Sequence, residues 1–420
     1  MSDQTRSNEL DLDENQAVQD LLGAAQNEAI EALDKDSVPS KKADEGQSLV
    51  EEEETEEKVQ EVEIELEEAL NKVEDLSEES TEEEKPRLSV VIAAYNGGPF
   101  IEEQLDSIYN QTLAVDELLI RDDGSKDNTV KVVQGWIEKH PDFNAHLIVG
   151  EENLGYIGNF AELLNQATGD WIFLCDQDDR WHLDKVEKMV AASKEVPTAK
   201  LIASSFEFMN QEGEVYHLPL NEGWSNQNLI PWAVENPEGL NKVTKEQMLL
   251  HNYFQGCAMM IRKELGEDYD RRHDFHLPHD WFLALLASVS DDLWYLDLPL
   301  FDYRIHHSNT TGLPQAKKET KWLRFRRHYN RYYRTAVIRD MENVYSTIQR
   351  SIPELDCEDI RIRLEFCSEY LKRIDGKNET YFRELKEHPG YTLCISEPEF
   401  ELAAKFVKLS RFIKFPDKKI

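Results

Sequence analysis

From residue 88 onward, short apolar runs alternate with segments whose apolar residues recur every three or four positions. The runs contain many aromatic and β-branched residues and end at turn residues, which predicts buried strands. The periodic segments predict helices with one apolar face. Strands are expected at 88–94, 118–120, 145–150 and 171–175, and helices at 100–110, 129–140 and around 160–164. This alternation predicts an α/β fold with a mostly parallel sheet covered on both faces.

Two acidic turns follow strands of this predicted sheet. Residues 176–179 read Asp-Gln-Asp-Asp and come directly after the apolar run 171–175. Three carboxylates this close repel one another unless a cation lies between them. Oxygen ligands of this kind suit Mg²⁺ or Mn²⁺ bound to phosphates. The alternative is that Asp179 caps a helix that begins near Trp181, while the other two carboxylates are solvated.

The second acidic turn favours the binding-site interpretation. Residues 122–125 read Asp-Asp-Gly-Ser and follow the strand at 118–120. An Asp-Gly turn alone is common and usually structural. Here, however, the order of strand, carboxylates and helix is the same as at 176–179, and ligands of such sheets bind at the carboxyl ends of strands. We therefore expect both turns to line one site.

The chain has 420 residues and a formal net charge of −37, and much of that charge lies at one end. Residues 1–85 hold 30 of the 84 acidic side chains but 7 of the 47 lysines and arginines. A Glu-rich stretch with few aromatic residues buries too little apolar surface to fold alone, so we expect a largely disordered or partly helical extension. Within it, residues 59–76 place apolar residues three and four apart, which indicates a fluctuating amphipathic helix or a weak oligomerisation element.

Composition also limits the class of protein. A nucleic-acid-binding protein would carry a basic surface, so the acidic balance argues against that class. The five cysteines show no paired spacing, which is typical of reduced thiols in a cytoplasmic protein. No basic-then-apolar signal peptide opens the sequence, and no stretch of 18 apolar residues occurs. We therefore expect a cytoplasmic protein without a membrane span.

Two basic segments lie toward the C-terminus. Residues 317–334 carry eight basic residues and one acidic residue interleaved with aromatic ones, and residues 405–420 carry six basic residues and one acidic residue. Such segments are typical of peripheral contact with an anionic membrane surface. The alternative is a helix packed on the rest of the protein with a solvated basic face. We expect three regions in all: the extension 1–85, an α/β domain at 86–315 and a basic helical region at 316–420.

Motifs in a fixed order connect the two acidic turns and continue beyond them. In order, the chain carries Ser89–Gly97, Glu103–Ile108, Gln111-Thr112, Asp122–Ser125 with Asp127, Asn153, Gly155, Asn159-Phe160, Gly169-Asp170, and Asp176–Asp179 with Trp181 and Lys185. This order resembles family 2 glycosyltransferases, inverting enzymes of the GT-A fold that use nucleotide sugars. Farther on come Gln255–Met260, His279-Asp280-Trp281, and Tyr303–His306 with Asn309 and Gly312. These resemble a narrower group, the bacterial rhamnosyltransferases of cell-wall and capsular polysaccharide synthesis, and the resemblance covers about residues 87 to 330.

The resemblance implies a nucleotide-diphospho-sugar transferase fold whose donor site lies at the two acidic turns. Asp178 is the expected direct ligand of Mn²⁺ or Mg²⁺, and Asp176 is expected at the metal or the ribose. Asp123 is the first candidate for holding the base and ribose, and Asp122 is the second.

The resemblance adds five further residues to the donor site. Ala94 and Tyr95 would line the nucleotide pocket, and Lys185 is grouped with the donor-binding residues. His306 falls where related enzymes often bring a late histidine to the metal or diphosphate, although an ordinary loop histidine is the alternative. Arg304 would pair with the diphosphate as a bidentate fork or, alternatively, anchor its loop.

An inverting transfer needs a base that takes the proton of the acceptor hydroxyl. Asp280 matches the family position of that base. Without the resemblance, an Asp after Pro278-His279 is more often a helix cap. Its neighbours His279 and Trp281 are expected to contact the acceptor, with a core position as the alternative for Trp281.

The sequence thus predicts a metal-dependent inverting glycosyltransferase of cell-surface polysaccharide synthesis. The expected donor is a nucleotide sugar, dTDP-rhamnose, and the expected acceptor is a saccharide or a polyprenyl-linked saccharide. The alternative is a non-catalytic GT-A-like binding or scaffold protein recruited through its acidic extension. The clustered carboxylates favour the enzyme, because a scaffold would be free to lose them.

Overall fold

The computed structural model describes residues 85–226, 229–306 and 335–409. Several sequence-based predictions fall outside these ranges: the extension 1–85 apart from its last residue, the amphipathic segment at 59–76 within it, the motif residues Asn309 and Gly312, the basic segment at 317–334 and the boundary between 315 and 316. The second basic segment, 405–420, is described only as far as residue 409. Residues 86–420 belong to one structural unit.

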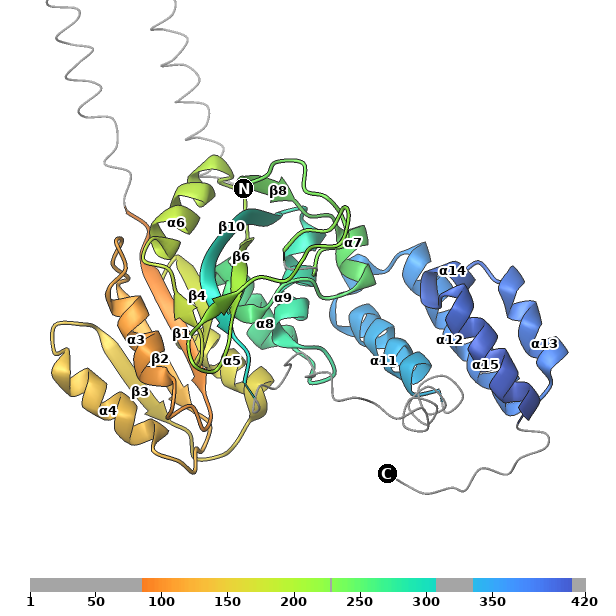
Figure 1. The fold of residues 1–420 in the computed structure, drawn as a ribbon, viewed down its shortest axis with the longest axis horizontal. Helices are drawn as coiled ribbons and strands as arrows, with labels where there is room; N and C mark the ends of the chain where they lie inside the picture. The colour runs from red at the N-terminus through yellow and green to blue at the C-terminus, as the bar shows by residue number, and fades with distance from the viewer. Residues whose placement is uncertain (1–84, 227–228, 307–334, 410–420) are drawn as a thin grey trace, which may run out of the picture. The chain divides into compact units, whose positions relative to one another are not determined.

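Four parallel strands form the first half of a mixed sheet (Figure 1). They are β1 (Leu88–Ala94), β2 (Glu117–Asp122), β3 (Ala145–Val149) and β4 (Trp171–Asp176), in the spatial order β3-β2-β1-β4. The apolar runs of the sequence form these strands, and β1 lies at the centre of the group, paired on both sides. Parallel pairing brings the carboxyl ends of β1, β2 and β4 to one edge of the sheet.

The helices that follow these strands cover both faces of the sheet. They are α3 (Ile101–Tyr109), α4 (Thr129–Lys139), α5 (Gly155–Gln166) and α6 (Lys185–Glu195). Alternate residues of β1 belong to two different cores, as the period of a strand requires. Residues of α3, α4 and α6 pack in one core, and residues of α5 pack in the other.

The second half of the sheet is less regular than the sequence pattern predicted. Strand β9 (Met259–Arg262) pairs antiparallel with β4 and with β6 (Leu201–Met209). Strand β10 (Leu293–Arg304) then runs parallel to β6, and β5 (Arg180–Trp181) pairs antiparallel with β10 at the edge. The α/β class is confirmed, while parallel pairing is confined to the first group and to the β6–β10 pair.

Short elements complete this part of the chain. They are β7 (Val215–Tyr216), β8 (Leu240–Lys242), α7 (Lys245–Leu250), the 3₁₀ turn η1 (Gly256–Ala258), α8 (Lys263–Arg272) and α9 (His279–Val289). Helix α9 is apolar nearly all round, and it is buried in the same core as α5 and α8.

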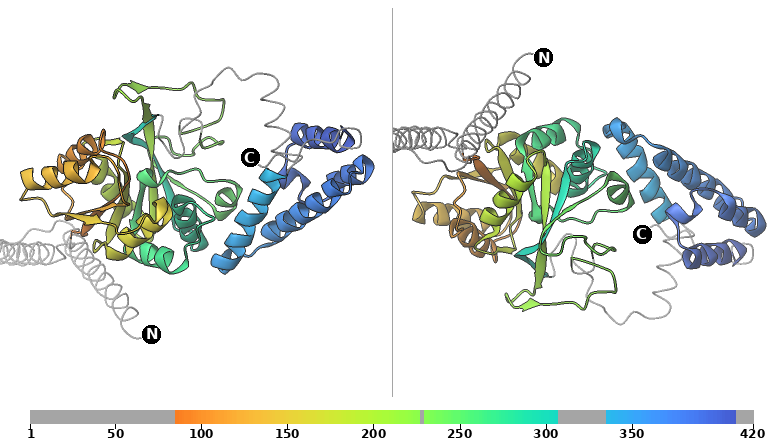
Figure 2. Two further views of the ribbon diagram at one scale, coloured as in Figure 1. Left: turned by 90° about the horizontal axis from the view of Figure 1, so that it is seen from below. Right: turned by 90° about the horizontal axis from the view of Figure 1, so that it is seen from above.

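The C-terminal region is helical (Figure 2). Its elements are α11 (Ala336–Ser351), η3 (Pro353–Leu355), α12 (Glu358–Asp375), α13 (Glu379–Arg383), η4 (Glu384–Glu387), α14 (Tyr391–Cys394) and α15 (Glu397–Leu409). One face of α11 joins the core of α5 and α9, and the Tyr345 hydroxyl donates to the Leu249 carbonyl at 3.0 Å. Helices α12 to α15 bury a separate apolar cluster. Of the helices that the structure describes, none is long and apolar enough to cross a bilayer.

Candidate functional site

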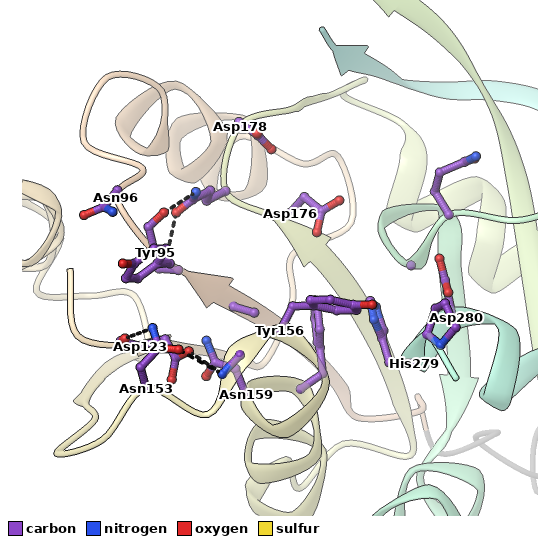
Figure 3. A pocket seen from close by; sticks show the side chains of 18 of the residues that line it. Tyr95, Asn96, Asp123, Asn153, Tyr156, Asn159, Asp176, Asp178, His279 and Asp280 are labelled. Atoms are coloured by element: carbon purple, nitrogen blue, oxygen red, sulfur yellow. Dashed lines mark hydrogen bonds between the residues drawn. The ribbon is translucent and has the colours of Figure 1, made fainter. Parts of the chain in front are cut away.

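A cleft of about 800 Å³ opens at the carboxyl ends of β1, β2 and β4 (Figure 3). The first turn of α5, the loop before η1, the start of α9 and the end of β10 complete its walls. Eight of the residues that the sequence singled out line it: Ala94, Tyr95, Asp123, Asp176, Asp178, His279, Asp280 and His306. They come from segments more than two hundred residues apart in the chain, so the fold brings the predicted motifs to one place.

One end of the cleft is organised around Asp123, which is 2% exposed. One carboxylate oxygen accepts from the Arg121 guanidinium and from the Leu154 amide, both at 2.8 Å, and the other accepts from the Gly155 amide at 2.8 Å. These two amides begin α5, so the carboxylate also meets the positive end of a helix. Asn159 accepts from the same guanidinium at 2.9 Å. Asp123 is therefore a rigid wall of the cleft and an anchor for α5.

Tyr95 is held at the same end by Gln177, which belongs to the acidic turn but was given no role by the sequence analysis. The Gln177 amide accepts from the Tyr95 backbone N–H at 2.8 Å and donates to its carbonyl at 2.9 Å. A Cβ on Gly97 would lie 2.1 Å from the Gln177 side-chain oxygen, which explains the glycine. Gln177 thus couples the end of β1 to the end of β4 and leaves the ring of Tyr95 half exposed toward the cleft.

The middle of the cleft carries the acidic turn. Asp178 meets His306, whose Nε2 lies 2.7 Å from the carboxylate oxygen Oδ2. Burial, and then the charge of Asp178, raise the pKa of Asp176 to about 7. Asp179 is fully buried and accepts from the Arg304 amide at 3.0 Å. It does not cap a helix, because α6 begins at 185 with Asp184 before it.

These groups fit a hard divalent cation. Among the described residues, Asp176, Asp179 and Cys257 bring ligand atoms within 4.8 Å of one another. Burial raises the pKa of the Cys257 thiol well above its usual value, so the thiol stays protonated and oxygen ligands remain. One buried oxygen of Asp179 has no hydrogen-bond partner within the described chain. Carboxylate oxygens of this kind suit a hard divalent cation. The group shares Asp176 with the expected ligands, but it does not include Asp178 or His306.

The other end of the cleft is built from the start of α9. Asp280 lies in the first turn, and one of its carboxylate oxygens accepts from the Trp281 amide at 2.7 Å. The His279 ring stacks on Phe160 at 4.1 Å between centroids and meets Tyr156 edge-on at 5.7 Å. Burial lowers the pKa of His279, so its imidazole is neutral at physiological pH. A carboxylate beside a neutral ring in the cleft is suited to accepting a proton.

Trp281 and Asp122 do not line the cleft. The Trp281 indole donates to the Met248 carbonyl at 2.8 Å and packs against the core. This is the core position that the sequence analysis gave as the alternative to acceptor contact. Asp122 turns into its own loop, where it accepts from the amides of Gly124 and Ser125 at 3.1 and 2.9 Å. The family resemblance ranked Asp123 ahead of Asp122, although the order of two adjacent carboxylates alone does not distinguish them. The strand places successive side chains on opposite sides, and Asp123 is the one that faces the cleft.

Lys185 lies beneath the acidic turn instead of in the cleft. Its ammonium donates to the Cys257 carbonyl at 2.7 Å and lies 4.4 and 4.3 Å from the ring centroids of Trp181 and Phe301. Burial lowers the pKa of Lys185 to about 8. Lys185 is fully buried and does not line the cleft, and its positive charge lies near Asp176.

Arg304 is also buried away from the cleft. Its Nε donates to the Asp178 carbonyl at 2.7 Å, and its Nη1 donates to the Gln211 carbonyl at 3.2 Å. Its Nη2 pairs with Glu103 at 2.5 Å. The guanidinium is held by protein groups on several sides, so the geometry is that of the loop anchor and not of a diphosphate fork.

Several residues of the cleft carried no separate prediction. Tyr156 and Asn159 project from α5, and Asn153, Gln255 and Gly256 line the walls. A Cβ on Gly256 would lie 2.3 Å from Nε2 of His279, so the glycine makes room for that ring. Asn159 and Gln255 belong to motifs visible in the sequence, but nothing local to them shows which side chain turns inward.

Comparison with known proteins identifies relatives of the chain. Residues 89–267 match the sequence model of the family "Glycosyl transferase family 2". The dTDP-rhamnosyl transferase RfbG of Shigella flexneri is 27% identical over 59% of this chain and 82% of its own length. The putative teichuronic acid biosynthesis glycosyltransferase TuaG of Bacillus subtilis is 31% identical over 31% of this chain, which spans half of that relative.

A solved structure also matches. Staphylococcus aureus TarS 1-349, in complex with UDP-GlcNAc, superposes with a TM-score of 0.47 at 14% identity, over 77% of this chain and 91% of that one.

Proposed function

Because this chain belongs to glycosyl transferase family 2, we propose that it is an inverting, divalent-cation-dependent glycosyltransferase that uses a nucleotide sugar. The observation that carries the proposal is one cleft with three parts. Asp123 and Tyr95 lie at one end, the acidic turn with His306 lies in the middle, and Asp280 lies at the other end. A nucleoside, a diphosphate and a sugar follow one another in the same order along a donor molecule.

Each part would have one task in the transfer. Asp123 and Tyr95 would hold the nucleoside. Asp176, Asp178 and His306 would hold a divalent cation, which when bound would neutralise the diphosphate leaving group. Asp280 would accept the proton of the acceptor hydroxyl as that oxygen attacks the sugar from the side opposite the diphosphate. This attack inverts the anomeric centre.

We propose L-rhamnose as the sugar, from dTDP-rhamnose, and a saccharide or polyprenyl-linked saccharide as the acceptor. Support comes from RfbG, which is named a dTDP-rhamnosyl transferase, and from TuaG, which is named for teichuronic acid biosynthesis. We also propose that residues 86–315 form the catalytic domain and that the basic segments toward the C-terminus contact an anionic membrane surface. A non-catalytic scaffold is disfavoured, because clustered carboxylates without a cation would only cost stability.

The proposal is tested first with the wild-type protein. Purified enzyme is incubated with Mn²⁺, an acceptor saccharide and each of several sugar nucleotides, and release of nucleoside diphosphate is measured. Release from dTDP-rhamnose above all others supports the rhamnosyl assignment. If nucleoside diphosphate is released from another sugar nucleotide, the proposed sugar is wrong but the proposed reaction class stands. If it is released from none of them, the proposal that the protein is a glycosyltransferase is contradicted.

Asp178→Ala then tests the cation site. Without a cation, the carboxylates of Asp176 and Asp178 would repel a diphosphate, so we expect the wild type to bind dTDP only in the presence of Mn²⁺. We expect Asp178→Ala to bind dTDP equally with and without Mn²⁺ and to have no transferase activity. Calorimetric titration of dTDP with and without Mn²⁺ measures this. Asp142→Ala, at an exposed aspartate outside the cleft, is the control. Equal dTDP affinity of the wild type in Mn²⁺ and in chelator would contradict the cation role.

A further inference from the structure

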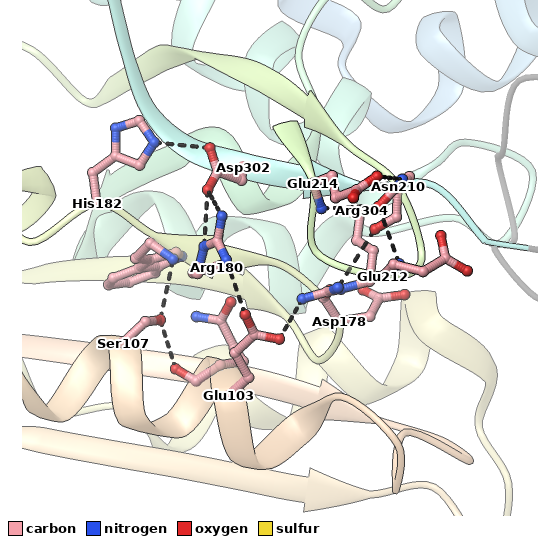
Figure 4. Close-up of polar contacts among 12 residues, drawn as sticks. Glu103, Ser107, Asp178, Arg180, His182, Asn210, Glu212, Glu214, Asp302 and Arg304 are labelled. Atoms are coloured by element: carbon pink, nitrogen blue, oxygen red, sulfur yellow. Dashed lines mark hydrogen bonds and ion pairs between the residues drawn. The ribbon is translucent and has the colours of Figure 1, made fainter. Parts of the chain in front are cut away.

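Phe100, the residue before α3, and Glu103, in its first turn, contact His306 and Arg304. The Phe100 ring lies 4.8 Å from the His306 ring and 5.0 Å from the Arg304 guanidinium carbon, measured from the ring centroids. One turn along the helix, Glu103 reaches the same guanidinium (Figure 4). Neither side chain was assigned a role by the sequence motifs, although Phe100 lines the cleft and Glu103 lies beside it, paired with Arg304.

Glu103 bridges two arginines that flank the acidic turn. Its Oε2 lies 2.5 Å from Nη2 of Arg304, and its Oε1 lies 3.2 Å from Nη1 of Arg180. On the far side, Asp302 pairs with Arg180 at 2.7 Å and with His182 at 2.9 Å. The carboxylate of Glu103 is thus the link between α3 and a charged network that surrounds the turn (Figure 4).

Arg304 connects Glu103 to the acidic turn. Its Nε donates to the Asp178 carbonyl at 2.7 Å, and its backbone amide donates to Asp179 at 3.0 Å. With the Asp178 backbone held there, the Asp178 side chain reaches His306 at 2.7 Å. Because His306 lies two residues beyond Arg304 on the same chain segment, one guanidinium sets the place of both expected ligands.

Charge explains why Glu103 is needed. The Arg304 side chain is 2% exposed, and a buried guanidinium is costly unless a carboxylate pairs with it. Asp178 contacts it through a backbone carbonyl and Asp179 contacts the backbone amide of Arg304, whereas Glu103 pairs with the guanidinium through its carboxylate. Replacing that carboxylate by an amide would leave the guanidinium drawn toward the carboxylates of the turn.

We propose that Glu103 is a positioning residue for the cation site, acting through Arg304 on Asp178 and His306. The proposal rests on the cation-dependent transfer proposed above. A purely structural alternative exists, because Glu102 and Glu103 both lie in the first turn of α3, where carboxylates stabilise a helix. Glu102 therefore provides a matched control. It pairs with Lys139 at 3.2 Å on an exposed surface and does not belong to the network.

The experiment compares Glu103→Gln with Glu102→Gln. Mn²⁺ affinity is measured in the presence of dTDP by electron paramagnetic resonance of the free ion, and folding is checked by thermal unfolding in chelator. We expect Glu103→Gln to weaken Mn²⁺ binding about tenfold, the usual effect of losing a residue that orients ligands. Turnover of that variant should recover at saturating Mn²⁺. Glu102→Gln should bind Mn²⁺ as the wild type does, and Glu103→Asp should recover part of the affinity.

A second variant tests the route through Arg304. In an Arg304→Lys background, which loses the fork to Asp178 and Glu103, Glu103→Gln should have little further effect on Mn²⁺ affinity, because residues that act as a unit are not additive. Equal Mn²⁺ affinity of Glu103→Gln and Glu102→Gln, or full additivity with Arg304→Lys, would overturn the proposal. A wild-type protein that binds no Mn²⁺ with dTDP would instead contradict the proposed function itself.

Discussion

The two ends of the cleft differ in how completely their polar groups are paired. At the Asp123 end, both carboxylate oxygens have donors, and Asn153 and Asn159 are hydrogen-bonded to the same strand and turn. At the Asp280 end, one oxygen of Gln255 and both ring nitrogens of His279 are buried without a partner among the described residues. Buried polar groups are normally paired, and those that are not often lie at functional sites.

In the proposed function, this difference would separate the part of the cleft that binds the nucleoside from the part that carries the chemistry. The Asp123 end is a rigid frame, set before any ligand arrives, and its side chains also hold α5 in place. At the Asp280 end, the ring nitrogens of His279 make no hydrogen bond to a described residue, so they are available to bind a ligand. Substitutions at the first end should therefore reduce stability and affinity together, whereas those at the second should change turnover with little effect on folding.

Asp280→Asn is expected to have the largest effect. Losing the base should lower turnover by about 10²- to 10⁴-fold, the usual size of general acid–base catalysis. Affinity for dTDP with Mn²⁺ should remain, because Asp280 lies at the opposite end from Asp123. Steady-state kinetics at saturating acceptor and calorimetry check the two parts. Near wild-type turnover would show that another group takes the proton.

Asp123→Asn is expected to act on folding as well as on binding. The Arg121 and Asp123 side chains are 8% and 3% exposed, so the change leaves a buried guanidinium without its carboxylate. Breaking a buried pair in this way costs about 3 kcal/mol. Urea unfolding should show the loss, and dTDP affinity should fall with it. Glu152→Gln, on the exposed loop beside this end, is the control. If Asp123→Asn were as stable as the wild type, the interpretation of the Asp123 end as a rigid frame would be wrong.

His279→Leu is expected to have the smallest effect on stability. The lost stacking on Phe160 is offset by removing two unpaired nitrogens, so at pH 8 the free energy of unfolding should change by less than about 1 kcal/mol. The pH dependence of the free energy of unfolding gives a clearer test of His279. Burial lowers the pKa of His279 in the folded state, so the unfolded chain takes up that proton first, and wild-type stability falls as the pH drops below about 6.5.

The Leu variant should lose this part of the pH dependence. Urea unfolding at pH 8 and pH 5.5 measures the difference for both proteins, and His146→Leu, which changes an exposed histidine outside the cleft, is the control. If the free energy of unfolding changed equally with pH in the wild type and in His279→Leu, His279 would be hydrogen-bonded in solution. The two ends of the cleft would then not differ in the pairing of their polar groups.

Local patterns were sufficient for the first half of the fold. Strands β1 to β4 and helices α3 to α5 lie within a few residues of their predicted positions, because alternating burial and helical spacing are properties of neighbouring residues. The second half needed tertiary contacts. Strand β10 pairs with β6 across about ninety residues, and nothing in either segment alone specifies that partner.

The same division holds for the site. The sequence by itself determined that carboxylates follow strands and that the ends of parallel strands meet, so it brought Asp123, Asp176 and Asp178 together. Asp280, at the start of α9, was added by the family resemblance alone. Only the tertiary structure decided that Trp281 turns into the core and that Arg304 is buried against Glu103, 201 residues away. The direction of a side chain depends on which distant group offers it a hydrogen bond or a counter-charge, and no local pattern contains that choice.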